Sequence, residues 1–565
     1  MKKCDLVMKG GITSGIVYPR AVAELAKEFR FVNIGGTSAG AIAAALTAAA
    51  EHRRQSQQSD AGFETLAQLP KWLGDNDGGR SRLLSLFQPS PDAEGLFAIA
   101  LAWIETPGTK RAKSLATLRA LGRHFNRYGS IALFIATVLI AISVATAWLL
   151  WDRTRIVSIG ALVAIVITIA IAAIAFFIAA IVEMIVTALR VLPRNGFGMC
   201  SGANGLTDWL AKQIDDVAGT SEPLTFGDLR KHDINFEMMT TNLTHGRPYR
   251  LPFDVRTFFF APSEMRALFP ERVVAKMIAC APEDSKPITT PSGETLVPFP
   301  SADDLPVIVA TRLSLSFPIL LSALPLWSVD YARRDVAHHA ERCWFSDGGI
   351  TSNFPVHFFD APVPRWPTFA INLAERTPRY HEDGQRMYVP TSNRGGTNEW
   401  WTPLESLPAF MNAILETMQN WRDNMTAKLI GRRDLIAHVL LAPNEGGLNL
   451  TMDAATIESV AARGHEAGAA FRSNYDKAWP NHRWIRCLAF MGSLEGTLGQ
   501  WSDAFDETLF DAPPPSYKVS QEERRAMRAA AVALHAHVRE NFATRPFHRA
   551  RTPRPEAMLR PMPRE

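Results

Sequence analysis

Two long uncharged segments constrain the fold of this chain more than any other feature. Ser130–Trp151 contains 22 residues and Ile156–Val182 contains 27, and neither includes a charged side chain. Helices of these lengths extend about 33 Å and about 40 Å, which is enough to cross a hydrocarbon core of about 30 Å. Only Asp152–Arg155 separates the two segments. The sequence therefore predicts an antiparallel membrane hairpin, with a buried helical pair of a soluble core as the alternative.

Basic residues flank the two segments unequally. Six precede the first segment and two follow the second, whereas the connection contains only Arg153 and Arg155. The positive-inside rule therefore places both outer ends, and the rest of the chain, on the cytoplasmic side. The N-terminal residues lack the apolar run of a secretory signal peptide. Lys113–Tyr128 has apolar and basic faces at helical spacing, which fits either an anionic membrane surface or an ordinary solvated helix.

Composition excludes several classes of protein. With 565 residues, 47% hydrophobic and 21% charged, the chain is expected to fold into two to four domains or into one large domain with insertions. Lys and Arg number 60 against 56 Asp and Glu, so no nucleic-acid partner is expected. The five scattered cysteines form no C-x-x-C pair, which argues against a disulfide framework and a cysteine zinc site. We expect neither a metal nor a cofactor, and protein partners stay undetermined.

The first 50 residues alternate strand, turn and helix twice. Cys4–Lys9 and Phe31–Ile34 are short apolar runs, each followed by a glycine pair, and Val17–Phe29 and Ala39–Ala50 have helical character. This order predicts a parallel sheet with helices on its faces. Later strands are expected at Asn235–Thr241, Thr257–Ala261, Cys343–Ser346, Thr368–Leu373 and His438–Leu441, and later helices at Asp304–Leu315, Leu407–Leu429 and Ala454–Phe471.

The sharpest local motif is Gly36-Thr37-Ser38-Ala39-Gly40, a G-x-S-x-G between an apolar strand and a helix. This context is the one that a nucleophile elbow requires, because glycines permit a strained turn that exposes the serine hydroxyl. The helix N-terminus favours negative charge beside that hydroxyl. A glycine-rich turn in which Ser38 only caps the helix is the alternative.

The turn before the first helix is a second candidate element. It reads Gly10-Gly11-Ile12-Thr13-Ser14-Gly15 and is poor in large side chains. Backbone N–H groups of such a turn can stabilise an oxyanion. The turn matches neither the P-loop pattern nor the dinucleotide pattern G-x-G-x-x-G.

A hydroxyl nucleophile needs a base, and Asp347 is the best candidate. It follows an apolar strand and precedes Gly348 and Gly349. A poorly solvated carboxylate there could take the Ser38 proton directly. A Ser–Asp–His triad is the other option, although none of the later histidines occupies a convincing loop. These histidines are His357, His381, His438 and His465.

The motifs GGITSG, GTSAG and DGG, in this order, resemble those of the patatin-like phospholipases. Two further segments support the resemblance. Ala310–Pro318 is similar to the family's A-x-R-x-S-x-S-x-P helix, and Asp347–Pro355 is similar to its D-G-G/A…N-x-P loop. The chain departs from the usual G-G-G-x-[RK]-G pattern, because Ile12 replaces the third glycine and Ser14 replaces the basic residue.

The resemblance implies a patatin-like α/β fold, a three-layer sandwich with a mostly parallel sheet, into which the transmembrane hairpin is inserted. It implies a Ser–Asp dyad that hydrolyses lipid or phospholipid esters, with Ser38 as nucleophile and Asp347 as proton acceptor. The implied oxyanion donors are the backbone amides of Gly10, Gly11 and Ile12. The implied motif glycines are Gly15, Gly36, Gly40, Gly348 and Gly349.

Two alternative functions stay open. A thioesterase, protease or transacylase with the same dyad is one, and a catalytically silent membrane binding or effector protein is the other.

The chain is expected to divide into six parts around the patatin-like core. These are the first core segment (1–50), an insertion (51–128), the hairpin (129–190), the second core segment (196–380), a C-terminal α/β extension (400–540) and a disordered tail (545–565).

Overall fold

A computed structural model defines the fold. It describes residues 1–11, 13–77, 80–106, 110–149, 155–254, 257–282, 288–330, 340–377, 381–382, 384–390, 404–429, 431–442, 445–447, 449–511 and 519–543. Ile12, most of the connection between the apolar segments, and the expected tail (545–565) lie outside the described residues.

Parallel strands form the centre of the main sheet. Their order is β16-β14-β1-β2-β6, and every neighbouring pair in this series is parallel. The sequence predicted all five strands to within a few residues. Their bounds are Lys2–Met8 for β1, Phe29–Gly36 for β2, Asn235–Asn242 for β6, Thr368–Glu375 for β14 and Ile436–Leu441 for β16.

Antiparallel strands extend the sheet on both sides, so the expectation of a mostly parallel sheet is wrong and the sheet is mixed. β13 (Ala340–Ser346) pairs antiparallel with β6, β12 (Leu324–Val329) pairs with β13, and β15 (Met387–Tyr388) pairs with β16. The sequence predicted a strand within β13, at Cys343–Ser346, but not its direction, because antiparallel neighbours need no crossover helix that would show in the strand–helix order. The other antiparallel strands are β7 (Arg247–Leu251), β8 (Phe259–Phe260), β9 (Ile288–Thr289) and β10 (Thr295–Pro298).

Different hydrophobic clusters pack against the two faces of the sheet. Leu6 and Met8 of β1 belong to the large core cluster that α1 (Tyr18–Ala26) and α2 (Ala39–Gln57) also supply, whereas Val7 belongs to a small cluster on the opposite face. This alternation follows from the two-residue period of a strand. The small cluster also contains Phe354, Val356, Ala370 and Ile436. Further helices of the body are α3 (Ala61–Gly74), α9 (Leu206–Ala218), α13 (Val307–Leu315) and α14 (Leu407–Ala427).

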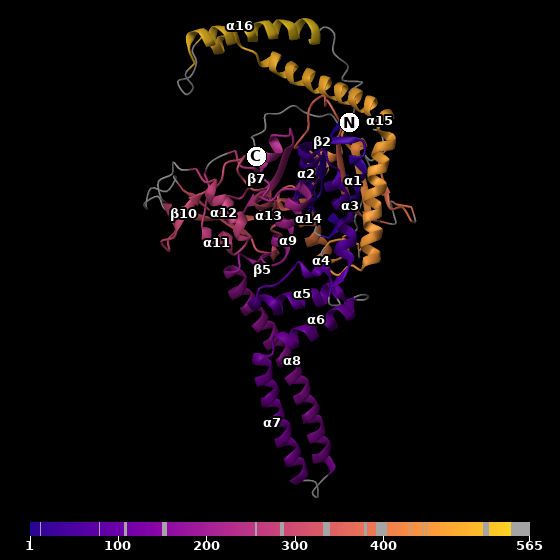
Figure 1. The fold of residues 1–565 in the computed structure, drawn as a ribbon. Coiled ribbons are helices and arrows are strands. Elements are labelled where there is room, and N and C mark those ends of the chain that lie inside the picture. The colour runs from indigo at the N-terminus through magenta and orange to yellow at the C-terminus, as the bar shows by residue number, and fades with distance from the viewer. Residues whose placement is uncertain are drawn as a thin grey trace.

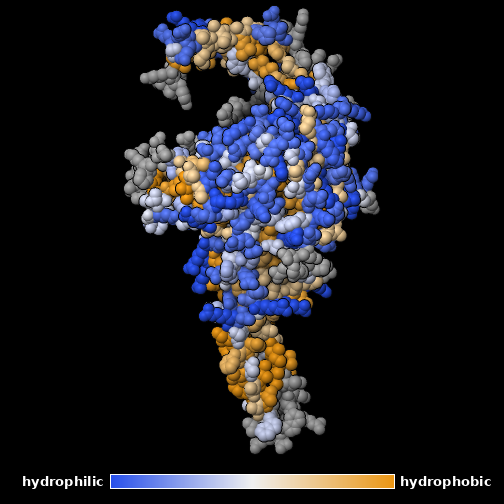
Figure 2. All heavy atoms as spheres, in the orientation of Figure 1, coloured by the Kyte–Doolittle hydropathy of each residue, from blue (hydrophilic) through white to orange (hydrophobic). Residues whose placement is uncertain are grey.

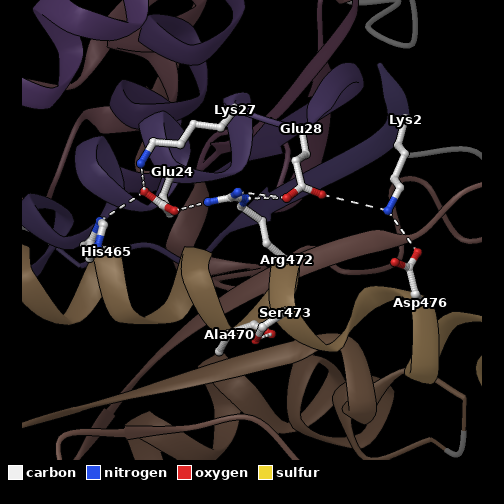
Figure 3. Close-up of polar contacts among 9 residues, drawn as sticks. All are labelled: Lys2, Glu24, Lys27, Glu28, His465, Ala470, Arg472, Ser473 and Asp476. Atoms are coloured by element: carbon white, nitrogen blue, oxygen red, sulfur yellow. Dashed lines mark hydrogen bonds and ion pairs between the residues drawn. The ribbon is translucent and has the colours of Figure 1, made fainter.

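A 51-residue helix, α15 (Ala454–Ala504), runs along the side of the body and packs against α1 and α3 (Figure 1). Charged residues tie α15 to the N-terminal elements (Figure 3). Arg472 forms ion pairs with Glu24 and with Glu28, the latter at 2.8 Å, and Lys2 lies 2.9 Å from Asp476. The C-terminal extension is thus continuous with the core, because β16 pairs with β14 in the same sheet.

The two apolar segments form helices α7 (Arg127–Leu149) and α8 (Arg155–Arg194), which lie side by side and project from the body (Figure 1). Both contain stretches long and apolar enough to cross a membrane. Only 12% and 11% of these stretches are buried, whereas a helix in a soluble core would be mostly buried. Figure 2 shows the hairpin as a hydrophobic column beneath a largely hydrophilic body.

Candidate active site

Ser38 lies in a tight turn between β2, which ends at Gly36, and α2, which begins at Ala39. Its backbone has φ 55° and ψ −129°, a conformation that costs a residue with a side chain about 1–3 kcal/mol. The flanking glycines make this turn possible. A Cβ on Gly36 would lie 2.3 Å from the carbonyl oxygen of Gly40, and a Cβ on Gly40 would lie 2.4 Å from that of Met8.

Asp347 follows the last residue of β13 and faces the serine across the sheet. The Ser38 hydroxyl donates a hydrogen bond of 2.7 Å to Oδ2 of Asp347. Both side chains are buried. The Ser38 side chain makes no hydrogen bond that caps α2, so its hydroxyl serves the aspartate rather than the helix.

Burial raises the pKa of Asp347 from 3.8 to about 7, although hydrogen bonds from Ser38 and from the Gly349 amide oppose this rise. The Gly349 N–H donates to Oδ1 at 2.6 Å. A carboxylate with a raised pKa is a stronger base than an ordinary one. The geometry therefore gives Ser38 a proton acceptor without a histidine.

The glycines after Asp347 are needed for close approach. A Cβ on Gly348 would lie 2.0 Å from the carbonyl oxygen of Met239, and one on Gly349 would lie 2.7 Å from Oδ1 of Asp347. Gly15 differs, since a Cβ there would meet the Ala39 Cβ at an acceptable 3.4 Å. Gly348 and Gly349 thus let the aspartate turn fit against β6.

The R-x-S-x-S spacing of Arg312, Ser314 and Ser316 has a geometric basis, because α13 and its C-cap residue contact both members of the Ser–Asp pair. The Ser38 N–H donates to Oγ of Ser314 at 3.2 Å, and the Asp347 N–H donates to the carbonyl oxygen of Ser316 at 3.0 Å. The buried Arg312 donates to Oγ of Ser316 and to the carbonyl oxygens of Ser201 and Ser322, which fixes the end of α13.

In the first glycine turn, the structure corrects the prediction that the Gly10 N–H is an oxyanion donor. The Gly10 N–H already donates to the carbonyl oxygen of Asn353 at 2.8 Å, so it is not free to stabilise an oxyanion in this geometry. Among the described residues, no acceptor is bonded to the Gly11 N–H. Gly11 is therefore the remaining described candidate donor, and Ile12 lies outside the described residues.

The sequence did not reveal the role of Asp423, a buried residue of α14. Its carboxylate accepts hydrogen bonds from the Ser352 hydroxyl (2.8 Å), the Asn353 N–H (2.6 Å) and the Phe354 N–H (2.8 Å). One turn earlier, Gln419 donates to the carbonyl oxygen of Gly349 at 2.5 Å. The C-terminal extension thus anchors the loop that carries Asp347.

Asn353 links this anchor to the first glycine turn and to the turn that carries Ser38. Its carbonyl oxygen accepts from the Gly10 N–H and from the Thr37 hydroxyl, the latter at 3.1 Å. The loop held by Asp423 therefore contacts both the first glycine turn and the serine elbow. No motif could have identified Asp423, since an aspartate on an amphipathic helix usually faces solvent.

Helix α14 is amphipathic, but it buries polar side chains and exposes its apolar side, the reverse of an ordinary surface helix. Gln419 and Asp423 face the loop that follows Asp347, and the apolar side faces outward. Seven apolar side chains of α14 are between 49% and 73% exposed: Leu407, Phe410, Met411, Leu415, Met418, Trp421 and Met425.

A histidine of a Ser–Asp–His triad was the alternative base, and the described residues show none bonded to the Ser–Asp pair. Neither Ser38 nor Asp347 has a hydrogen bond to any histidine within the described part of the chain. His465 lies 3.2 Å from Glu24. His438 stacks on Tyr388, and burial lowers its pKa to about 4. In the described ranges, no three His, Cys, Asp or Glu side chains come together to hold a metal.

An apolar cavity begins beside the serine. Gly15 and Ala39 line it next to Ser38, and most of its other lining residues are aliphatic or aromatic. Part of the wall belongs to β11 (Ile319–Leu321), which pairs with β5 (Gly198–Cys200) directly after α8. The remaining wall residues include Ile42, Ala43, Leu46, Leu83, Leu86, Phe87, Leu206 and Phe317.

The fold and site define an α/β protein in which an elbow serine is hydrogen-bonded to a buried aspartate. The family model for patatin-like phospholipase matches residues 6–145, which include the first glycine turn and Ser38. A protein of Rhizobium meliloti (strain 1021) described as "RpoH suppressor" is 35% identical over 93% of this chain and 93% of its own length. The chain belongs to the patatin-like phospholipase family, whose members are typically lipid acyl hydrolases.

Among solved structures, the chain is similar to VipD from Legionella pneumophila, with 12% sequence identity and a TM-score of 0.28. That match covers 96% of this chain and 86% of VipD. A score this low supports no argument about fold or function.

Proposed function

We propose that this protein is a membrane-anchored serine acyl hydrolase that cleaves lipid esters, as a phospholipase A or lysophospholipase does. The observation that carries the proposal is the 2.7 Å hydrogen bond from Ser38 to the buried, basic carboxylate of Asp347. The apolar cavity beside Ser38 supports a substrate with a long acyl chain.

In the proposed reaction, Oγ of Ser38 attacks the ester carbonyl carbon while its proton passes to Oδ2 of Asp347. The Gly11 N–H is the described candidate to stabilise the tetrahedral oxyanion. Collapse of this intermediate breaks the ester C–O bond, and Asp347 returns the proton to the leaving alcohol. Asp347 then takes a proton from water as that water attacks the acyl-enzyme, the bond between Oγ of Ser38 and the acyl carbon breaks to release the fatty acid, and Asp347 returns the proton to Oγ of Ser38.

The apolar hairpin supports the membrane part of the proposal. Its two helices are exposed and long enough to span a bilayer, and the flanking basic residues favour a cytoplasmic catalytic body. Anchoring would hold the site close to a lipid leaflet and raise the local concentration of substrate.

The test is hydrolysis of a fluorogenic ester and of a fluorescent phospholipid by detergent-purified protein. We expect Ser38→Ala and Asp347→Asn to reduce turnover to background while the circular dichroism spectrum stays unchanged. Thr65→Ser, a change at an exposed residue of α3 whose hydroxyl bonds to the carbonyl oxygen of Ala61, serves as a control that should retain activity. Activity that survives Ser38→Ala would rule out this nucleophile.

The same dyad also suits a thioesterase or a transacylase, which acyl-acceptor assays would separate. A silent binding or effector protein is the alternative from another class, and the altered GGITSG turn favours it. Wild-type protein that hydrolyses none of a broad set of acyl esters would support that alternative.

A further inference from the structure

The helix pair between the body and the hairpin has a surface that the proposed reaction does not use. α5 (Glu94–Glu105) and α6 (Lys110–His124) lie at the end of the body from which the hairpin projects, and α6 is the closer of the two (Figure 1). Figure 2 shows a hydrophilic band at this junction, directly above the hydrophobic column.

The C-terminal end of α6 packs against α8 near the point where the apolar segments begin. Leu121 and Phe125 form a cluster with Ala180 of α8, and Phe177 and Met184 pack against it. The cluster therefore places the C-terminal end of α6 against the upper part of α8.

Glu183 of α8 marks the boundary between polar and apolar surroundings. Its carboxylate accepts hydrogen bonds from the N–H groups of Arg127 (3.0 Å) and Tyr128 (3.5 Å), at the start of α7. A carboxylate at a helix N-terminus satisfies otherwise unpaired donors. Below this level most exposed side chains of both helices are apolar, and the hydroxyls of the exposed Thr137 and Thr146 donate to carbonyl oxygens of their own helix.

The outer side of α6 combines basic and apolar residues. Leu115 and Leu118 are 50% and 39% exposed, and the exposed Arg111, Arg119 and Arg123 lie on the same helical face. None of these three arginines has an acidic partner within the described ranges. Exposed leucines flanked by unpaired arginines suit the headgroup region of a bilayer rather than bulk water.

We propose that α6 binds the anionic headgroups of the leaflet that the hairpin enters. Leu115 and Leu118 lie between the lipids, and Arg111, Arg119 and Arg123 bind phosphate groups. The partner is an anionic phospholipid leaflet, argued from the positive charge of this face and its continuity with the exposed apolar hairpin. The proposal rests on the membrane anchoring stated under the proposed function, and it makes the protein selective for anionic membranes.

The test uses full-length Leu118→Cys protein reconstituted into vesicles of phosphatidylcholine alone or mixed with phosphatidylglycerol. A water-soluble maleimide labels position 118, and peptide mass mapping separates this label from labels on the native cysteines. We expect labelling to be slower in vesicles that contain phosphatidylglycerol and to recover at high salt. Each arginine near an anionic surface should contribute about fivefold to this protection.

Two variants in the Leu118→Cys background make the result specific. Changing Arg111, Arg119 and Arg123 to Gln should abolish the protection. The matched control changes Arg524, Arg525 and Arg539 to Gln and should retain the protection. These residues belong to α16 (Gln521–Val538) and its C-cap, and α16 lies at the opposite end of the molecule from the hairpin (Figure 1).

Equal labelling in both vesicle types, or equal behaviour of the two triple variants, would overturn the proposal. Protection by inorganic phosphate alone, in phosphatidylcholine vesicles, would indicate a soluble-anion site instead of a leaflet. Protein that fails to float with vesicles would overturn the anchoring and this proposal together. Unchanged labelling in protein that does float overturns only the role of α6, and neither readout requires hydrolase activity.

Discussion

Replacing Asp423 by Asn tests whether a residue outside every recognised motif organises the catalytic loops. The carboxylate accepts from one hydroxyl and two backbone N–H groups of residues 352–354. Oδ2 accepts both backbone N–H groups and Oδ1 accepts the Ser352 hydroxyl. In Asn, the amide oxygen can keep the two N–H bonds while its NH₂ group donates to the Ser352 hydroxyl, so the substitution removes the negative charge of the acceptor and reverses one bond.

The size of the effect follows from these contacts. A hydrogen bond to a charged acceptor contributes about 1.5–3 kcal/mol, against about 0.5–1.5 kcal/mol for a neutral one, and two buried backbone bonds lose the charge of their acceptor. We therefore expect Asp423→Asn to lower the free energy of unfolding by about 1–3 kcal/mol. Relaxation of the loop would also move Asp347 relative to Ser38, and a displacement of about 1 Å can reduce turnover about 100-fold.

The assay measures kcat and KM on a soluble ester together with thermal unfolding. Asp215→Asn is the matched control, because Asp215 is also buried, accepts from the Leu224 N–H and pairs with Arg272, yet does not contact the catalytic loops. We expect both variants to lose stability, but only Asp423→Asn to lose kcat per folded molecule, with KM little changed. Equal kcat for the two variants would refute the positioning role.

The same structure gives four further predictions. Turnover should rise with pH through an apparent pKa near 7, because only ionised Asp347 accepts the serine proton; a rate that is flat between pH 5 and pH 9 would contradict this. Since the folded-state pKa of Asp347 is raised, folding takes up a proton and stability falls as pH rises from about 4 to about 7, and thermal melts should show Asp347→Asn removing this fall. Ala43→Phe should narrow the apolar cavity, so a chain-length series of esters should shift toward shorter acyl groups, while Ala48→Ser, outside the cavity wall, should not shift it. Burial raises the pKa of Glu24 but bonds from Lys27 and Arg472 outweigh it and lower the pKa, so Glu24→Gln should reduce the free energy of unfolding at neutral pH by about 1–3 kcal/mol, and the difference should disappear in strong acid.

Local chemistry made several elements predictable. The strand–turn–helix around Ser38 and the strand end before Asp347 depend on glycines and apolar runs within a few residues, so the sequence indicated both. The five parallel strands were predictable for the same reason. The amphipathic helix near residues 407–429 was also predicted, but the sequence did not show that its apolar side faces outward, because that depends on which distant elements pack against it.

Long-range pairing decided the rest. The mixed character of the sheet depends on β13 pairing antiparallel with β6, a choice that no local pattern encodes. The sequence suggested that the Gly10 N–H is free to stabilise an oxyanion, but in the folded chain it donates to the carbonyl oxygen of Asn353. Both outcomes depend on contacts between residues more than a hundred positions apart.

By itself, the sequence determined the apolar hairpin, the elbow serine and the aspartate turn, because each is set by side chains and backbone freedom within one short segment. Only the tertiary structure decided that Ser38 and Asp347 meet within 2.7 Å and that Asp423, from the C-terminal extension, anchors the loop between them. The physical reason is that buried donors of that loop need an acceptor, and the fold supplies it from whichever distant element packs there.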